Sequence, residues 1–356
     1  MLNRTSLFKR HQAEGARLVE FAGWEMPLQY ESITAEHAAV RDGVGIFDVG
    51  HMGRFFITGE RAAEGLDWIV VSRVRDLEPG RVRYTVVCNR EGGTRDDVLV
   101  MRLGKDAFLV VVNASNREKL LPWFTEHLGA GIAFRDLTLE SGMIAIQGPE
   151  APRVTRELLE IELDSLSYYH VRKLGDGVMV SRTGYTGEDG FEIIAPNERL
   201  ESLWCRARES GAQPAGLGAR DSLRLEMAYP LYGHELDEEI TPLEAGLGRL
   251  VHLEKERFIG KAALQRQKER GVPRQRIGFV MDGQGIPRHG YTLLDGDEAI
   301  GQVTSGGFSP TLKKGIGLGL VRSGNENPKN LYVLIRGKKV SSRIKKPPFV
   351  PKHVKK

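Results

Sequence analysis

The chain has 356 residues, of which 40% are hydrophobic and 28% charged, so it can bury substantial cores and is expected to divide into two or three domains. A net charge of +4 is too small to indicate a nucleic-acid-binding protein, and no apolar run approaches the roughly 20 residues that span a membrane. The two cysteines lack metal-ligand spacing, so neither a disulfide framework nor a metal site is predicted. The N-terminal segment lacks the apolar stretch of a secretory signal, and we expect a cytoplasmic protein; a mitochondrial mature form without its leader would have the same features.

In chain order, the first informative elements are two predicted strands, 84–88 and 97–102, joined through a glycine turn at 89–93. Asp96 and Asp97 stand where this turn runs into apolar residues. Because side chains alternate along a strand, one of the two carboxylates lies on whichever face is buried. A buried carboxylate is costly unless it is paired, so it usually belongs to a site or an ion pair; a turn carboxylate that caps backbone amides is the alternative.

Further apolar patterns predict a mixed α and β chain. A helix is expected to start after Ser115, which has capping-box spacing to Glu118 ahead of Leu120, and Asn197 is expected to cap another helix. The other predicted strands are 108–113, 143–147, 178–182, 191–195, 277–281, 300–304 and 332–335, and the other predicted helices are 151–161 and 261–270. The change to short strands and turns predicts a division into residues 1–250 and a small β domain at 251–356.

A glycine-rich loop at 182–190 precedes Glu192, which begins a predicted strand. Tyr185 places a flat ring in this loop. An inward-facing Glu192 carboxylate needs donors, and a guanidine-like edge such as that of a pterin offers two in parallel. The alternative partner is Arg220, at the start of a predicted helix, so ligand contact and internal ion pair both remain open.

The C-terminal segment 338–356 carries eight Lys and Arg residues and no acidic one. A solvated tail is one interpretation, and a surface that steers an acidic protein or a polyanionic ligand is the other. RNA binding is disfavoured because Phe349 is the one aromatic residue among these charges.

Several short motifs recur together in the order of a known family. The chain resembles, from end to end, the folate-binding T-protein family of the glycine cleavage system. The motifs that carry the resemblance are FAGWEMPL at 21–28, FDVGHMG at 47–53, GGTRDD at 92–97, IQGP at 146–149, GYTGE at 184–188, GARD at 218–221 and TSGGFSPTL at 304–312.

This resemblance implies an α+β protein with three domains in a cloverleaf-like arrangement, a central folate site and a C-terminal β-barrel-like domain. It implies an aminomethyltransferase that takes an aminomethyl group from the lipoyl arm of the H protein. Tetrahydrofolate, as co-substrate, accepts the methylene; ammonia, 5,10-methylenetetrahydrofolate and dihydrolipoyl H protein are the products. Neither a metal nor a redox cofactor is implied.

The resemblance also assigns roles to individual residues. By motif position, Asp96 matches the catalytic carboxylate, which strand alternation alone does not decide. The residues expected to bind folate are Glu192, Arg220, Tyr84, Met52, Asn113, Tyr169 and Tyr185. Because the partner in this family is generally acidic, a basic rim is expected to dock it, formed by Arg288, Lys345 and Lys346 together with Lys313, Lys314 and Arg343.

Two positions depart from the family pattern. Gly50 replaces a serine found in many relatives, which leaves open how the Met52 loop is held, and Val354 replaces a folate-contacting tyrosine of some relatives, so no folate contact is carried over to the tail. Two related functions remain as alternatives. A folate-dependent demethylase of the same fold is often fused to an oxidase domain, for which no residues are left over, and a non-enzymatic iron-sulfur maturation factor carries a cysteine motif that GYTGE lacks.

Overall fold

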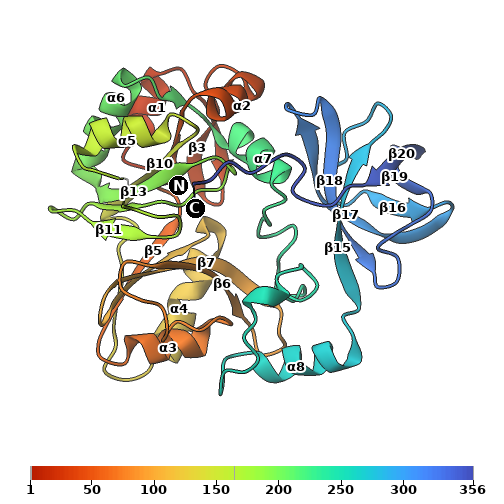
Figure 1. Ribbon diagram of the computed structural model, residues 1–356, viewed down its shortest axis with the longest axis horizontal. Coiled ribbons are helices and arrows are strands. Elements are labelled where there is room, and N and C mark those ends of the chain that lie inside the picture. The colour runs from red at the N-terminus through yellow and green to blue at the C-terminus, as the bar shows by residue number, and fades with distance from the viewer. Residues whose placement is uncertain (1, 164, 356) are drawn as a thin grey trace.

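The computed structural model describes residues 2–163 and 165–355. Its helices and strands form three lobes that meet at the centre of the molecule (Figure 1). Two lobes combine a sheet with helices, and the third is a closed β-barrel formed by the C-terminal part of the chain. The predicted α+β class, the three-part arrangement and the C-terminal barrel are confirmed.

The first lobe is built on a six-stranded sheet. Its strands are β4 (Gly45–Asp48), β10 (Ser141–Gln147), β11 (Val171–Lys173), β12 (Met179–Ser181), β13 (Gly190–Pro196) and β14 (Gln213–Pro214), in the order β11-β12-β13-β10-β4-β14. Helices α5 (Ala151–Leu159) and α6 (Asn197–Glu209) pack on β10 and β13. In α5 the buried residues Ala151, Val154 and Leu158 recur at helical spacing, so one stripe of the helix faces the sheet.

The same lobe contains a second, three-stranded sheet and three more helices. The strands are β1 (Asn3–Arg4), β2 (Arg17–Phe21) and β3 (Trp24–Gln29), and the helices are α1 (Phe8–Ala13), α2 (Ile33–Asp42) and α7 (Leu217–Glu226). Helix α7 contacts α2, β3 and barrel strands, so it lies where the first lobe meets the barrel (Figure 1).

The second lobe is a five-stranded antiparallel sheet with two helices. Its elements are β5 (Gly53–Thr58), α3 (Ala62–Ile69), β6 (Val82–Cys88), β7 (Thr94–Gly104), β8 (Ala107–Val112), the 3-10 turn η1 (Ala114–Asn116), α4 (Arg117–His127) and β9 (Ala133–Asp136), with strand order β6-β7-β8-β5-β9. The predicted hairpin of β6 and β7 is confirmed, and Gly92 in its turn has a φ of +89°. Because β7 begins at Thr94, both Asp96 and Asp97 belong to the strand.

The barrel closes through six strands. They are β15 (Arg274–Met281), β16 (Thr292–Asp295), β17 (Glu298–Ser309), β18 (Lys314–Arg322), β19 (Leu331–Ile335) and β20 (Lys338–Ile344), in the order β15-β18-β17-β16-β19-β20. The segment before the barrel contains the turn η2 (Gly248–Leu250) and helix α8 (Lys261–Arg270). Leu264 of α8 packs with Val86 and Cys88 of the second lobe. The domain boundary at residue 250 stays a prediction.

After β20 the chain leaves the barrel and returns to the centre of the molecule, where Figure 1 marks its C-terminal end. The Phe349 N–H donates to the Glu226 carbonyl at 2.8 Å, and the His353 N–H donates to the Gly187 carbonyl at 2.8 Å. The tail is therefore tied by its backbone to the helix α7 and to the glycine-rich loop of the first lobe.

The two predicted helix caps are wrong. Ser115 lies inside η1, and α4 begins two residues later without a side-chain cap. Asn197 is the first residue of α6 rather than its cap, and its side-chain amide donates to the Leu139 carbonyl at 2.7 Å. In both places local spacing alone misplaced the start of the helix by one or two residues.

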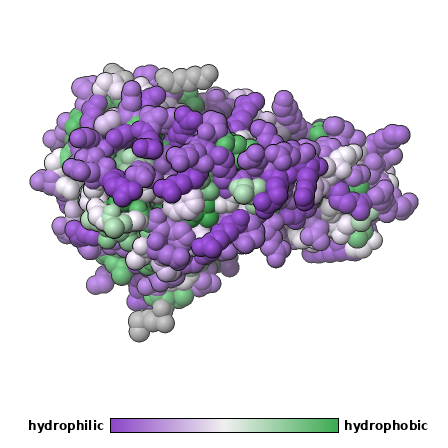
Figure 2. All heavy atoms as spheres, turned by 90° about the horizontal axis from the view of Figure 1, so that it is seen from below, coloured by the Kyte–Doolittle hydropathy of each residue, from purple (hydrophilic) through white to green (hydrophobic). Residues whose placement is uncertain are grey.

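The face of the molecule seen in Figure 2 is covered mainly by hydrophilic residues, with hydrophobic ones in small scattered groups. Within residues 2–163 and 165–355, no helix is both long and apolar enough to cross a membrane.

Candidate active site

The carboxylates of Asp96 and Asp97 lie on opposite faces of β7. Asp96 is fully buried on the face of Val98 and Val100, which pack in the core beneath α3 and α4. Asp97 is half-buried on the face of Leu99, which packs against a hydrophobic cluster shared by the first and second lobes. The alternation of the strand therefore directs Asp96 into the second lobe and Asp97 toward the junction of the lobes.

Both carboxylates share the amide of Asn113, which follows β8. This amide donates at 2.8 Å to Asp96 and at 2.8 Å to Asp97. Asp96 also accepts from the Asn113 N–H at 3.0 Å and from the Asn116 amide, whereas Asp97 accepts from the Tyr84 hydroxyl at 2.8 Å. Burial raises the pKa of both carboxyls, and the charge of Asp97 raises the pKa of Asp96 further.

The loop that carries Met52 is held by a buried arginine. Arg54 in β5 donates to the carbonyls of Gly50, at 3.1 Å, and of Met52. Its Nη2 atom donates to the carbonyls of Thr138 and Ser141, at 2.6 and 2.8 Å, and its Nε atom donates to the Ser141 hydroxyl at 2.9 Å. The Arg54 side chain thus fixes the loop through backbone carbonyls, which do not depend on the side chain at position 50.

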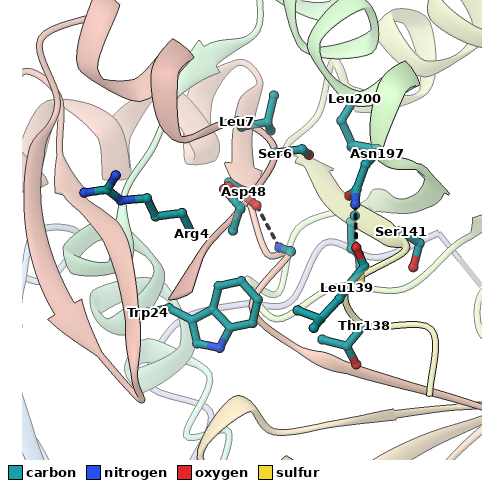
Figure 3. Close-up of a pocket in the computed structure, with 14 residues that line it drawn as sticks. Arg4, Ser6, Leu7, Trp24, Asp48, Thr138, Leu139, Ser141, Asn197 and Leu200 are labelled. Carbon is teal, nitrogen blue, oxygen red and sulfur yellow. Dashed lines mark hydrogen bonds between the residues drawn. The ribbon is translucent and has the colours of Figure 1, made fainter. Parts of the chain in front are cut away.

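Gly50 is one of the residues that line a small cavity beside the loop, shown in Figure 3. The Gly50 N–H donates to Asp48 at 2.7 Å, and a Cβ atom at position 50 would lie 2.9 Å from the same carboxylate oxygen. The cavity measures about 40 Å³ and lies between β1, β4 and the start of α6, near Trp24 and Asn197. This volume suits a few water molecules rather than a substrate.

Glu192 is buried in β13 and is only partly satisfied by protein donors. The Thr183 hydroxyl donates to its Oε2 atom at 2.5 Å. In the described part of the chain, its Oε1 atom has no hydrogen bond, and no ion pair joins Glu192 to Arg220 within 4.0 Å. Burial raises the pKa of Glu192, and the nearby charge of Arg220 partly offsets that effect. The internal ion pair considered from the sequence is therefore not formed.

The rings of Tyr185 and Tyr229 form an aromatic wall, and Arg220 packs on the Tyr185 end of it. The guanidinium of Arg220, on the first turns of α7, lies 4.8 Å from the centre of the Tyr185 ring. The Tyr185 ring stacks on Tyr229 at 5.6 Å and 25°. Tyr169, whose φ is +59°, contacts Tyr168 edge to face at 4.7 Å and packs against the same cluster as Met52.

The expected folate residues converge on the junction of the lobes. Burial is the main cause that raises the pKa values of Tyr169 and Tyr185. The charge of Asp97 raises both values further, and the charge of Glu192 raises the pKa of Tyr169. These side chains therefore lie close enough to interact electrostatically. The residues brought together are Met52, Tyr84, Asn113, Tyr169, Tyr185, Glu192 and Arg220, with Asp97. The Asp96 carboxylate does not join them, because it faces the opposite side of the sheet.

Two charged residues near this set, the buried Glu235 and the half-buried Arg276, were not identified from the sequence. Glu235 accepts from the hydroxyls of Thr304 and Ser305, at 2.5 and 3.0 Å, and its charge raises the pKa of Asp97. Arg276 in β15 donates to the Ala228 carbonyl at 3.2 Å, and burial lowers its pKa, an effect opposed by the charge of Glu235. Thr304 and Ser305, which bind Glu235, belong to the TSGGFSPTL motif, but this motif predicted neither Glu235 nor Arg276.

The residues expected to dock a carrier lie on the barrel lobe. Arg288 is exposed in the loop between β15 and β16, and in the segment after β20 Lys345 is half-buried and Lys346 exposed. Of the other residues of the expected rim, Arg343 forms an ion pair with Asp282, whereas Lys313 and Lys314 are exposed at the β17–β18 turn.

Comparison with known proteins agrees with this architecture. Two family models match the chain, the GCVT N-terminal domain over residues 7–255 and the glycine cleavage T-protein C-terminal barrel domain over residues 274–351. The chain is 49% identical over 353 residues to an aminomethyltransferase of Rubrobacter xylanophilus, covering 98% of this chain and 94% of that protein. It is 46% identical over 329 residues to an aminomethyltransferase of Alkaliphilus oremlandii, covering 90% and 89%.

A solved structure has the same fold over its whole length. The crystal structure of glycine cleavage system aminomethyltransferase T from Bartonella henselae superimposes with a TM-score of 0.96 at 31% identity, covering 100% of both chains. With family models over most of the chain, close relatives along its whole length and this shared fold, the chain belongs to the glycine cleavage T-protein family.

Proposed function

We propose that this protein is the aminomethyltransferase of the glycine cleavage system. It transfers the methylene of the aminomethyl group on the lipoyl arm of the H protein to tetrahydrofolate. Family membership and relatives named aminomethyltransferase support this reaction class. Both cysteines are free thiols and the relatives named above are bacterial, which supports a cytoplasmic location.

The observation that carries the folate assignment is the pair Glu192 and Arg220. Glu192 presents a buried carboxylate with one oxygen open, and an ionised carboxylate accepts several hydrogen bonds. The 2-amino group and ring N–H of a pterin supply two parallel donors to such an acceptor. Arg220, held over the Tyr185 ring, keeps its guanidinium available to a ligand in the same space.

We assign the catalytic carboxylate to Asp97 rather than to Asp96, the residue expected from motif position. Asp97 faces the side of the sheet that carries the folate residues, and its partners Tyr84 and Asn113 hold it in place. Asp96 is enclosed by the amides of Asn113 and Asn116 and acts as a positioning residue for Asn113.

The reaction balances without a redox step. The methylene carbon loses its bonds to sulfur and to the amino nitrogen and gains bonds to nitrogens 5 and 10 of the folate. The two protons released from these nitrogens appear on the lipoyl thiol and in ammonia. A fixed Asp97 carboxylate stabilises the positive charge that develops on the methylene carbon and takes up a proton when nitrogen 10 attacks.

We also propose that the basic rim of Arg288, Lys345 and Lys346 docks the acidic carrier. Rim charges mainly raise the encounter rate, and salt screens them with a Debye length of about 8 Å at physiological ionic strength. The double variant Lys345→Glu, Lys346→Glu is expected to raise the KM for the H protein, most strongly at low salt, with folate affinity unchanged. Kinetics across an ionic-strength series measure this, and a KM equal to wild type at every salt concentration contradicts it.

The function is tested with purified protein, aminomethylated H protein and tetrahydrofolate, by measuring ammonia and methylenetetrahydrofolate. Glu192→Gln is expected to weaken tetrahydrofolate binding about tenfold or more, because two pterin donors lose a charged acceptor. Glu201→Gln, at an exposed position of α6, is the matched control. Absence of turnover by the wild-type protein refutes the reaction, and unchanged folate affinity of Glu192→Gln refutes the site.

A further inference from the structure

Lys352 of the C-terminal tail extends the aromatic wall of the site. Its ammonium lies 4.9 Å from the centre of the Tyr168 ring and 5.6 Å from the centre of the Tyr229 ring. The Tyr168 hydroxyl lies 3.2 Å from the same ammonium. Since Tyr229 stacks on Tyr185, and Arg220 lies over Tyr185, a continuous row runs from Arg220 through two rings to Lys352.

The backbone on both sides of Lys352 is anchored, so this position is part of the fold. Phe349 is buried and its N–H donates to the Glu226 carbonyl, while the His353 N–H donates to the Gly187 carbonyl, both at 2.8 Å. The His353 ring also lies 3.1 Å from the buried Glu188 carboxylate. These contacts hold the tail against the glycine-rich loop that carries Tyr185.

The charge of Lys352 has no counter-ion in the described part of the chain. No carboxylate lies within 4.0 Å of its ammonium among residues 2–163 and 165–355; its close neighbours are phenol rings. Burial raises the pKa of Tyr168, so its hydroxyl stays neutral and does not balance the lysine. A cation held on ring faces with open donors is suited to an anionic group that arrives with a ligand.

We propose that Lys352 binds the glutamyl carboxylates of tetrahydrofolate and so selects folates that carry this group. The inference rests on the proposed function, in which Glu192 and Arg220 receive the pterin. Lys352 is exposed and separated from Arg220 by the rings of Tyr185 and Tyr229, so it lies at the solvent-facing end of the row. The glutamyl group is at the opposite end of folate from the pterin, which matches this separation.

The test compares the affinities of two ligands in oxygen-free buffer, tetrahydrofolate and tetrahydropteroate, which lacks the glutamyl group. For the wild-type protein, tetrahydrofolate is expected to bind more tightly. Lys352→Met keeps most of the apolar side chain but removes the charge, and is expected to reduce this preference about tenfold. Lys352→Arg is expected to preserve it, and added salt to weaken it in the wild type. Lys338→Met, at an exposed position of β20, is the matched control.

The outcomes separate this inference from the function on which it rests. If Lys352→Met weakens both ligands by the same factor, Lys352 only supports the structure of the tail and the inference is overturned. If Lys352→Met binds both ligands with the affinities of the wild-type protein, the inference is also overturned, while the proposed function is left intact. Failure of the wild-type protein to bind either ligand contradicts the proposed function itself.

Discussion

Asp96 and Asp97 are neighbours in β7, yet their carboxylates have different surroundings. The side-chain amide of Asn113 donates a hydrogen bond to each of them. Asp96 also accepts hydrogen bonds from the Asn113 backbone N–H and the Asn116 side-chain amide, within the second lobe. Asp97 instead accepts one from the Tyr84 hydroxyl, at the junction of the lobes. A substitution of Asp96 is therefore expected to change mainly the stability of the protein, and a substitution of Asp97 mainly the rate of the reaction.

Asp97→Asn is expected to lower kcat for aminomethyl transfer on the order of a hundredfold or more, because a preorganised charge is removed from the place where positive charge develops. Asp96→Asn is expected to lower the free energy of unfolding by about 1–3 kcal/mol, since it removes an acceptor from buried amides, with a smaller effect on kcat. Single-turnover kinetics and denaturant unfolding measure the two effects.

Asp42→Asn, at the exposed end of α2, serves as the control for this pair. Since burial raises the pKa of Asp97, the acid limb of the rate profile is expected above the ordinary carboxyl range near 4, with activity rising as the carboxyl ionises. Equal loss of kcat at Asp96 and Asp97, or a larger loss at Asp96, refutes the assignment of roles.

At the scale of elements, the loop between β4 and β5 depends on one buried cation. Arg54 donates to four backbone carbonyls, of Gly50, Met52, Thr138 and Ser141, and to the Ser141 hydroxyl. Burial lowers its pKa to about 10, which leaves the guanidinium charged at neutral pH. One side chain thus joins the loop that carries Met52 to the segment before β10.

Arg54→Met is expected to lower the free energy of unfolding by about 3 kcal/mol or more, because several buried carbonyls lose their donors. Tetrahydrofolate affinity is expected to fall as well, since Met52 is no longer held. Thermal unfolding and a folate titration at low temperature measure the two effects. Arg135→Met, on the exposed side of β9, is the control, and a fully stable Arg54→Met protein contradicts the prediction.

At the scale of the whole molecule, Glu226 joins the first lobe to the barrel. Its buried carboxylate pairs with Arg41 of α2 at 2.8 Å and accepts from the Ser309 and Thr311 hydroxyls of the barrel, at 2.5 and 3.0 Å. Although burial opposes ionisation, the hydrogen bonds and charges of His37, Ser309 and Arg41 hold the pKa of Glu226 at about 2. The ionised form is thus strongly favoured in the folded state.

The pKa of Glu226 is lower in the folded protein than in the unfolded chain, so the ionised carboxylate stabilises the folded state at pH values above the ordinary glutamate pKa near 4.5. This stabilisation is lost as the pH falls toward about 2. Glu226→Gln is expected to lower the free energy of unfolding at pH 7 by about 3 kcal/mol and to flatten the acid limb of the stability profile. Denaturant titrations between pH 3 and about 7 measure this.

Glu298→Gln, at an exposed position of the barrel, controls for charge removal alone. Limited proteolysis adds a second measure, since release of the barrel from α7 is expected to expose the segment after β20. An acid profile identical for wild type and Glu226→Gln shows that Glu226 does not couple the lobes.

Local patterns predicted most elements because they depend on neighbours in sequence. The helix 261–270 has the predicted bounds in α8, and the hairpin turn before Asp96 is confirmed. The two predicted caps were wrong for different reasons. Ser115 belongs to a 3-10 turn that precedes the helix, and the side chain of Asn197 donates to the Leu139 carbonyl instead of capping its helix. Motif order, which summarises the whole chain, predicted the family and its fold.

The sequence by itself determined which chemical groups the protein has and, through the order of its motifs, the family to which it belongs. Only the tertiary structure decided which carboxylate faces the residues proposed to bind folate and that Glu192 is not paired with Arg220. It also brought the tail residue Lys352 to Tyr168 and Tyr229. The physical reason is that strand alternation separates two faces without saying which one is buried, whereas contacts between distant segments exist only once the lobes have packed together.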